Sequence, residues 1–289
     1  MKFLTFLYQG RQHAGVLSGG EVTPIEEINA THGTTIPNDL LEIIRAGIQV
    51  PHDAARSGAR RLPLDLVQQL LPYANPPKIW CIGLNYLSHA ADIQAVQPEE
   101  PGSFMKPASC MFQPGGAIIL PPPDISSEVD AEGELGVIIG KTCRYLQAGS
   151  VAGAIFGYTT TLDLTALDVL RRNPRYLTRA KCCDTFFSFG PVVVTADEIP
   201  DVDALEVITE HNGAICSRDF VRHMHTRPFE LVRFHSDYMT LHPGDLISTG
   251  CPKGARIAAG DRVRARIDGV GTLEASVTQG TRPGGKLLD

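Results

Sequence analysis

The hydrophobic and polar pattern of the N-terminal quarter predicts a small mixed unit. Residues 2–8 and 14–17 are apolar-rich runs on either side of a polar segment, which predicts a β-hairpin. Residues 38–47 combine an N-cap candidate, helical spacing and a closing glycine, which predicts a short helix. Residues 63–71 form a second amphipathic segment. We therefore predict a small N-terminal α+β domain over residues 1–72.

Strand patterns dominate the rest of the chain. A proline-containing break at residues 73–77 marks a linker, and short β-branched apolar runs follow it. The fold class is therefore α+β and mostly β, with a larger domain over residues 78–280 and a polar, glycine-containing tail at 281–289. Strands are predicted at 79–84, 117–120, 129–140, 157–163, 192–194, 205–209, 246–249, 260–267 and 273–277, and helical segments at 85–92, 165–172 and 229–241.

Two glutamates begin the strand at 129–140. Alternate residues of a strand share a face, so Glu132 and Glu134 point the same way, while the apolar residues that follow them alternate to the other face. Two close carboxylates repel each other, and a hard divalent metal ion removes that conflict. The alternative is an edge strand with two solvated glutamates. Asp163 ends another β-rich run and adds a third carboxylate where a strand gives way to a helical pattern.

Composition narrows the function classes. The chain has 289 residues, and its hydrophobic share of 43% suffices for a sizeable core. The net charge of −6 without a basic block argues against nucleic-acid or anionic-membrane partners. No run approaches membrane-spanning length, and the N-terminus lacks a signal-peptide pattern. The seven cysteines have no metal-type C-x-x-C spacing, so we expect reduced thiols and a cytoplasmic protein.

Several motifs, in order from about residue 78 to about residue 277, resemble the fumarylacetoacetate hydrolase (FAH) family. The likeness is to the branch with a small N-terminal domain, which includes acylpyruvate and fumarylpyruvate hydrolases and 2-hydroxyhepta-2,4-diene-1,7-dioate isomerases. It implies a layered β-sandwich or roll and a homodimer. The matching motifs are G-L-N-Y-x-x-H-A-A at 83–91, F-M-K-P-A-S at 104–109, E-x-E-L at 132–135, G-Y-T-x-x-x-D at 157–163, K-x-x-D-T-F at 181–186, G-P-V-V-V-T at 190–195 and P-G-D-L-I-S-T-G at 243–250.

The resemblance also implies a metal centre. Glu132, Glu134 and Asp163 would hold Mg²⁺ or Mn²⁺, with Ca²⁺ also compatible, and the ion would chelate two oxygens of a 2-oxo acid or 1,3-diketone. His89 would activate water and Asp92, three residues later on the same helical face, would orient it. From the residues alone, a solvated helix pair is the alternative for these two.

Five further residues complete the predicted site. Lys181 would stabilise the enolate formed with the metal when the C–C bond breaks, and a surface salt bridge to Asp184 is its alternative. Lys106 would bind an anionic part of the substrate or else be a surface lysine. Asp184 from the K-x-x-D motif, with Thr249 and Cys251 from the T-G-C-P loop, would also bind substrate. Cys251 as a covalent nucleophile is disfavoured, because no cationic residue adjoins it in sequence.

Four positions depart from the family pattern. Leu167 and Leu170 stand where the family has an arginine and a glutamine that bind the substrate. Two alternatives follow: a substrate that is more apolar at that end, or replacement of the lost donors by Arg171 or Arg172 from the next turn. Asp92 is one methylene shorter than the family's glutamate, and Cys251 replaces a threonine.

The predicted function is divalent-metal-dependent hydrolysis of a C–C bond in a 1,3-diketo compound similar to acylpyruvate or fumarylpyruvate, through a metal-bound enolate. The same chemistry supports a decarboxylase or isomerase of 2-oxo or 2-hydroxy-dienoic acids, such as oxaloacetate or aromatic meta-cleavage products. A weakly active metal-binding protein with a binding role is the remaining alternative.

Overall fold

The computed structural model describes residues 1–51, 53, 58–87 and 98–282. Two sheets dominate it, one of twelve strands and one of five. The strands are β1 Lys2–Tyr8, β2 Arg11–Ser18, β3 Glu21–Pro24, β4 Leu62–Pro63, β5 Gln68–Gln69, β6 Ile79–Gly83, β7 Gly102–Lys106, β8 Ala117–Leu120, β9 Val129–Ile139, β10 Ile155–Ala166, β11 Phe187–Thr195, β12 Glu206–His211, β13 Ala214–Phe220, β14 Leu246–Ser248, β15 Ala255–Ile257, β16 Arg262–Ile267 and β17 Gly271–Gln279. The α-helices are α1 Ile25–His32, α2 Leu40–Ala46, α4 Leu167–Arg172, α5 Leu177–Lys181 and α6 Pro228–Tyr238. The mostly β, α+β prediction is confirmed.

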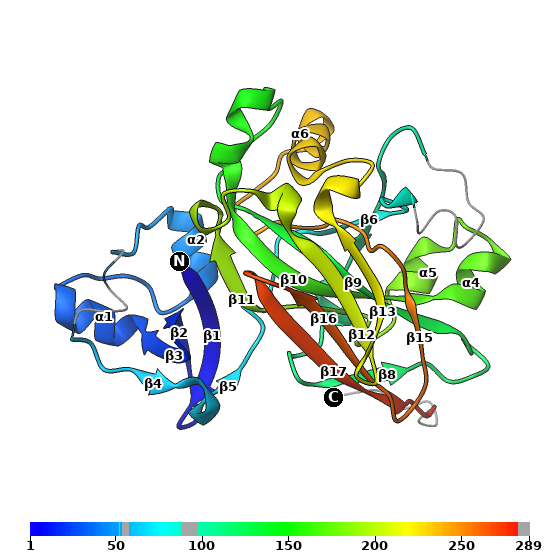
Figure 1. Cartoon of the computed structure of the whole chain (residues 1–289), viewed down its shortest axis with the longest axis horizontal. Helices are drawn as coiled ribbons and strands as arrows, with labels where there is room; N and C mark the ends of the chain where they lie inside the picture. Colours follow the sequence, from blue (N-terminus) through cyan, green and yellow to red (C-terminus); the bar gives the residue numbers. More distant parts are fainter. Residues whose placement is uncertain (52, 54–57, 88–97, 283–289) are drawn as a thin grey trace.

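The large sheet continues from the N-terminal segment into the rest of the chain. Its strand order is β4-β3-β2-β1-β11-β10-β9-β14-β6-β7, with β15 paired to β9 and β5 paired to β1. β1 is antiparallel to β11, so Phe3 is opposite Val193. Figure 1 shows the resulting N-terminal lobe in blue, joined to the larger part through this strand pair. The two parts therefore share one sheet across the predicted boundary.

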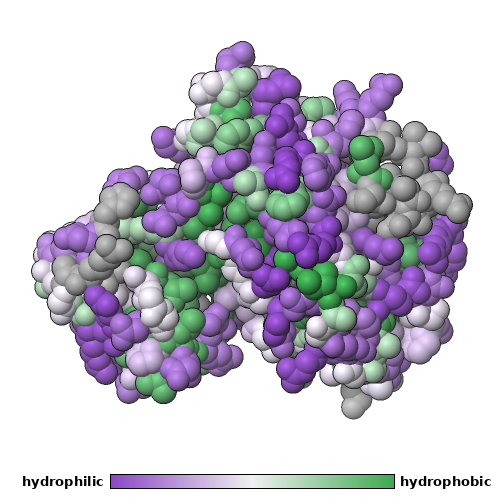
Figure 2. All heavy atoms as spheres, in the orientation of Figure 1, coloured by the Kyte–Doolittle hydropathy of each residue, from purple (hydrophilic) through white to green (hydrophobic). Residues whose placement is uncertain are grey.

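The predicted elements of the N-terminal segment form in part. β1 and β2 make the expected hairpin, and α2 is the expected helix, capped by the Asp39 carboxylate, which accepts from the Glu42 N–H. Residues 63–71 are not an α-helix. They hold the end of β4, a 3₁₀ turn at Leu64–Leu66 and strand β5. Figure 2 shows that apolar side chains on this face gather where the N-terminal lobe meets the larger part.

Strand β9 lies at the centre of the protein, because β10 and β14 flank it in the large sheet and the small sheet packs against it. The edge-strand alternative for the two glutamates is therefore wrong. Leu135 and Val137 pack with Val207 and Ile267 of the small sheet, on the face opposite the glutamates. The small sheet has the order β13-β12-β16-β17-β8.

Gly133 lets the two sheets approach each other closely. It lies between the glutamates and faces the small sheet, where its N–H donates to Thr209 Oγ1 at 3.1 Å. A Cβ at this position would lie 2.7 Å from Thr209 Oγ1 and 3.0 Å from the Ala265 Cβ. Glycine is therefore required here by packing.

Two observed element boundaries differ from the predicted ones. Thr165 and Ala166 belong to β10, and the helix after Asp163 begins only at Leu167. Asp163 consequently lies within β10 and not at its end. The helix predicted at 229–241 is α6, which ends at Tyr238. Among the residues that the structure describes, no helix has the length and apolar character needed to cross a membrane.

Candidate functional site

The register of β9 against β10 brings the three predicted acids together. Asp163 is directly opposite Glu132 in this antiparallel pair, and Glu134 is two residues along the same face of β9. All three side chains are buried, with exposed fractions of 7% for Glu132, 1% for Glu134 and 1% for Asp163. Buried carboxylates require hydrogen bonds or opposite charges, and the structure supplies both.

Hydroxyl and backbone donors orient the two glutamates. Thr165 donates to Glu132 Oε1 at 2.7 Å. The Ser248 hydroxyl and the Gly250 N–H, the latter at 3.0 Å, both donate to Glu134 Oε2. Local pattern does not predict the roles of Thr165 and Ser248, because both depend on strand register. The only local hint was the position of Ser248 in a family motif.

Lys181 lies between two of the carboxylates. Its Nζ is 2.7 Å from Glu132 Oε2 and 2.7 Å from Asp163 Oδ2, so the alternative of a surface salt bridge to Asp184 is wrong. Burial disfavours the ammonium form, but Asp163, Glu132 and Glu134 outweigh it and raise the pKa of Lys181. The side chain therefore stays protonated at neutral pH. The same ammonium lies 4.9 Å from the centre of the Phe104 ring.

Lys106 is also buried, with an exposed fraction of 3%, so the surface alternative for it is wrong. It pairs with Asp163 Oδ1 and donates to the carbonyl oxygens of Leu164 at 3.2 Å and Phe186 at 2.7 Å. An ammonium has three donors, and all three have acceptors here. Lys106 therefore anchors Asp163, and its predicted contact with substrate stays a prediction.

The charges of this cluster do not balance. Three carboxylates and two ammonium groups leave one net negative charge when all are ionised. Burial, followed by repulsion from Asp163 and Glu132, raises the pKa of Glu134 to about 8. Burial also opposes ionisation of Asp163, but Lys106 and Lys181 lower its pKa below the ordinary value. Glu134 therefore takes up a proton more readily than Asp163 does.

A divalent cation fits this donor set. Carboxylate oxygens are the preferred ligands of Mg²⁺ and Mn²⁺. A cation beside Glu132 and Glu134 would remove the repulsion that now favours a proton on Glu134. The buried cluster, with its excess of negative charge, therefore has the composition of a metal centre.

Cys251 is a neighbour that the motif analysis placed near substrate but not beside the acids. Its Sγ and one carboxylate oxygen each of Glu132 and Glu134 all lie within 4.8 Å of one another. Burial, then Glu132 and Glu134, raise the pKa of the thiol well above its ordinary value. A raised pKa disfavours the thiolate, in agreement with the prediction that Cys251 is not a covalent nucleophile. The substitution of threonine by cysteine in the T-G-C-P loop was the signal available in the sequence.

The other predicted residues lie as follows. Thr249 is buried, and its hydroxyl donates to the Leu135 carbonyl oxygen at 2.9 Å. Asp184 is exposed. His89 and Asp92 lie outside the described residues, so their pairing stays a prediction.

Arg171 and Arg172 both pair with acidic residues outside the carboxylate cluster. Arg171 pairs with Glu128 at 2.6 Å, and Arg172 lies 3.7 Å from Asp168. Both guanidinium groups are exposed and are engaged outside the carboxylate cluster. Leu167 is buried and Leu170 partly buried in the apolar cluster that includes Phe186 and Leu164.

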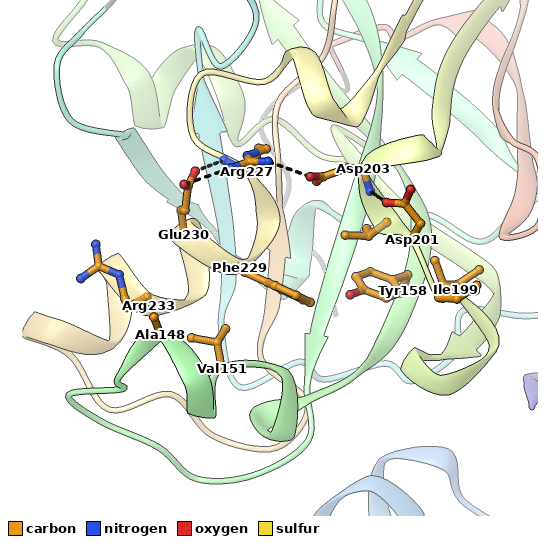
Figure 3. Close-up of a pocket in the computed structure, with 12 residues that line it drawn as sticks. Ala148, Val151, Tyr158, Ile199, Asp201, Asp203, Arg227, Phe229, Glu230 and Arg233 are labelled. Atoms are coloured by element: carbon orange, nitrogen blue, oxygen red, sulfur yellow. Dashed lines mark hydrogen bonds and ion pairs between the residues drawn. The ribbon is translucent and has the colours of Figure 1, made fainter.

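A separate cavity of about 350 Å³ lies beside the first turn of α6. Figure 3 shows Arg227 reaching Asp203 and Glu230 above the cavity, with the Phe229 and Tyr158 rings facing each other across it. Tyr158 precedes Asp163 by five residues on β10, which corresponds to about 17 Å along a strand. The cavity is therefore distinct from the carboxylate cluster.

The fold and this cluster define a class of layered β proteins with a buried acidic centre. Residues 78–278 match the family model for the C-terminal domain of fumarylacetoacetate hydrolase, and the chain belongs to this family. The predicted resemblance is confirmed.

Three relatives show the range of the family. The chain is 33% identical to mitochondrial oxaloacetate tautomerase FAHD2A of Bos taurus over 273 residues, which are 90% of this chain and 86% of the relative. A maleylpyruvate hydrolase from Sphingobium sp. SYK-6, in complex with manganese(II) and pyruvate, superposes with a TM-score of 0.80 at 30% identity and covers 97% of this chain and 100% of its own. A 2-hydroxyhepta-2,4-diene-1,7-dioate isomerase from Mycobacterium marinum superposes with a TM-score of 0.76 at 29% identity. The match covers 98% of this chain and 100% of the isomerase chain. These three relatives are enzymes: a tautomerase, a hydrolase and an isomerase.

Proposed function

We propose that the chain is a divalent-cation-dependent enzyme that hydrolyses a C–C bond in a small 1,3-diketo compound similar to acylpyruvate. The observation that carries this proposal is the buried cluster of Glu132, Glu134 and Asp163 with the Lys181 ammonium between two of them. The similarity to a structure holding manganese(II) and pyruvate supports it, because pyruvate is a 2-oxo acid.

Glu132, Glu134 and Asp163 would hold Mg²⁺ or Mn²⁺. Bound there, the cation supplies Lewis-acid polarisation of two substrate oxygens. The chain's own residues fix the ligands in advance: Thr165 orients Glu132, Ser248 and Gly250 orient Glu134, and Lys106 holds Asp163. Ligands held in this way need little rearrangement when the ion binds.

Lys181 provides a fixed positive charge beside the reacting atoms. Its raised pKa keeps it protonated, so it acts as a hydrogen-bond donor and not as a base. When the C–C bond breaks, the electron pair passes to the 2-oxo fragment and forms an enolate. An ammonium in a buried site stabilises such a developing charge more strongly than it would in water.

The water that attacks the neighbouring carbonyl needs a base. His89, oriented by Asp92, is the candidate from the motif analysis, and it would take the proton from water as the new C–O bond forms. The proton would then pass to the enolate carbon, giving a carboxylic acid and a 2-oxo acid as products.

A second candidate is tautomerisation or decarboxylation of a 2-oxo acid. The observation in its favour is the 33% identity over 273 residues to an oxaloacetate tautomerase. Both reactions form an enolate that Lys181 would stabilise. They differ from hydrolysis in that no water attacks the substrate.

The test is a substrate panel assayed with Mn²⁺. It contains a 2,4-diketo acid, a neutral 1,3-diketone and oxaloacetate, with products identified as carboxylic acid, 2-oxo acid, enol tautomer or carbon dioxide. Glu132→Gln is compared with wild type, and Glu128→Gln, which removes partly exposed ion pairs with Arg171 and Arg256, is the matched control. We expect Glu132→Gln to lower kcat/KM by on the order of 100-fold or more, because it weakens the metal centre.

The products decide between the candidates. Metal-dependent release of a carboxylic acid from either diketo compound supports the hydrolase, and cleavage confined to the neutral diketone would connect Leu167 and Leu170 with specificity. Turnover of oxaloacetate alone would replace hydrolysis by the second candidate. No turnover of any substrate by wild type would reject both and favour a binding role.

A further inference from the structure

Cys251 lies beside Glu132 and Glu134 in the acidic cluster. Its sulfur and the carboxylate oxygens of Glu132 and Glu134 lie within 4.8 Å of one another, and all three residues are buried. Two ligand atoms bonded to one ion at ~2.0–2.3 Å are at most ~4.6 Å apart. Small side-chain rotations therefore suffice to bring all three atoms to a common ion.

The backbone brings the cysteine to this point. β14 is antiparallel to β9, with Ser248 opposite Gly136, so the residues that follow β14 pass Glu134. The N–H of Thr249 donates to the Leu135 carbonyl oxygen, and the N–H of Gly250 donates to Glu134 Oε2. Gly250 has a φ of +92°, and a Cβ there would lie 3.0 Å from the Ile82 carbonyl oxygen. Only glycine allows this path, which fixes the thiol next to the acids.

The thiol is buried, and within the described part of the chain it makes no hydrogen bond. Cys110 and Cys216 differ in this respect, because their thiols lie 2.9 Å from the Pro107 carbonyl oxygen and 3.1 Å from the Thr209 carbonyl oxygen. A buried cysteine commonly serves as a small apolar filler. An apolar filler has no preference for a position between two carboxylates, whereas a metal ligand requires one.

We propose that Cys251 is a sulfur ligand of the metal ion that Glu132 and Glu134 hold. This inference rests on the proposed function, since it requires a metal at the carboxylates. Coordination replaces the S–H bond by a sulfur–metal bond and releases one proton to solvent. A thiolate ligand favours Co²⁺, Zn²⁺ and Fe²⁺ over Mg²⁺, so the centre is selective for softer ions than an all-oxygen site is.

Cobalt(II) reports the bond directly. The metal-free full-length protein is titrated with Co²⁺ under reducing conditions, and the near-ultraviolet thiolate-to-cobalt charge-transfer band is recorded with the visible d–d bands. We expect wild type to show both and Cys251→Ser to show only the d–d bands. A Cys182→Ser/Cys183→Ser variant, which removes the two adjacent and partly exposed thiols, should keep the charge-transfer band.

Affinities provide a second readout. We expect Cys251→Ser and Cys251→Thr to weaken Co²⁺ and Zn²⁺ binding by at least the ~10–100-fold that loss of an outer ligand partner causes. Mg²⁺ affinity should stay unchanged, because Mg²⁺ gains little from sulfur.

The outcomes separate the two proposals. If Co²⁺ binds with d–d bands and no charge-transfer band, or if the band survives Cys251→Ser, then Cys251 is not a ligand and the carboxylate centre still stands. If neither wild type nor Cys251→Ser binds Co²⁺, Mn²⁺ or Mg²⁺ while circular dichroism shows both folded, the metal-dependent function itself is wrong.

Discussion

Replacing Gly133 by alanine tests how the close approach of the two sheets supports the site. The change adds one methyl group between Glu132 and Glu134, on the opposite face of β9. That methyl would lie 2.7 Å from Thr209 Oγ1 and 3.0 Å from the Ala265 Cβ, both closer than normal contact. It would also push away the hydroxyl that accepts from the Gly133 N–H at 3.1 Å.

The magnitude follows from these two contacts. Overpacking a close-packed interior by one methyl costs about 1–3 kcal/mol. Weakening one buried hydrogen bond adds about 1 kcal/mol. We therefore expect Gly133→Ala to lower the free energy of unfolding by about 2–4 kcal/mol. Metal affinity should fall as well, because the two flanking glutamates move with the strand.

Urea unfolding of the metal-free protein measures the stability change. Gly149→Ala is the matched control, since an added Cβ there meets no atom within 4 Å, and it should shift stability by less than about 0.5 kcal/mol. Adding Thr209→Ala to Gly133→Ala makes room for the methyl, so the two changes should be less than additive. Equal unfolding midpoints for Gly133→Ala and Gly149→Ala would refute the steric argument.

Two further predictions concern the charges. Lys106→Met leaves the buried Asp163 carboxylate without one of its two cations, so we expect a loss of about 3–5 kcal/mol in urea unfolding, partly restored by Mn²⁺. The exposed Lys141→Met should be neutral, and an equal effect of both changes would contradict the pairing. In a Cys251→Ser background, Mn²⁺ affinity measured by calorimetry should fall about 50-fold from pH 8 to pH 6. The reason is that Glu134, with a pKa of about 8, must release a proton before it binds the ion. Glu134→Gln should remove this slope, and constant affinity over that range in the Cys251→Ser background would show that Glu134 does not bind as a carboxylate.

Much of the fold and part of the site follow from local pattern. Strand alternation alone placed Glu132 and Glu134 on one face and Leu135 and Val137 on the other. The order of short motifs led to the family, which the match over residues 78–278 confirms. Hydrophobic spacing also predicted the hairpin of β1 and β2 and the helices α2 and α6. These features depend on residues a few positions apart, which is the range that periodicity can report.

The partners of the acids depend on the tertiary structure. Lys106 is 57 residues from Asp163 in sequence, and Ser248 is 114 from Glu134, so no local pattern connects them. The sequence left open whether Lys106 is a surface lysine or a substrate ligand. In the structure it is buried and pairs with Asp163. Cys251 reaches the glutamates only because β14 pairs with β9 in one register. A shift of one residue in that register would move every side chain of the strand to the other face. Local sequence pattern therefore identifies which residues could be ligands, whereas the packing of the two sheets sets which charges and which sulfur surround them.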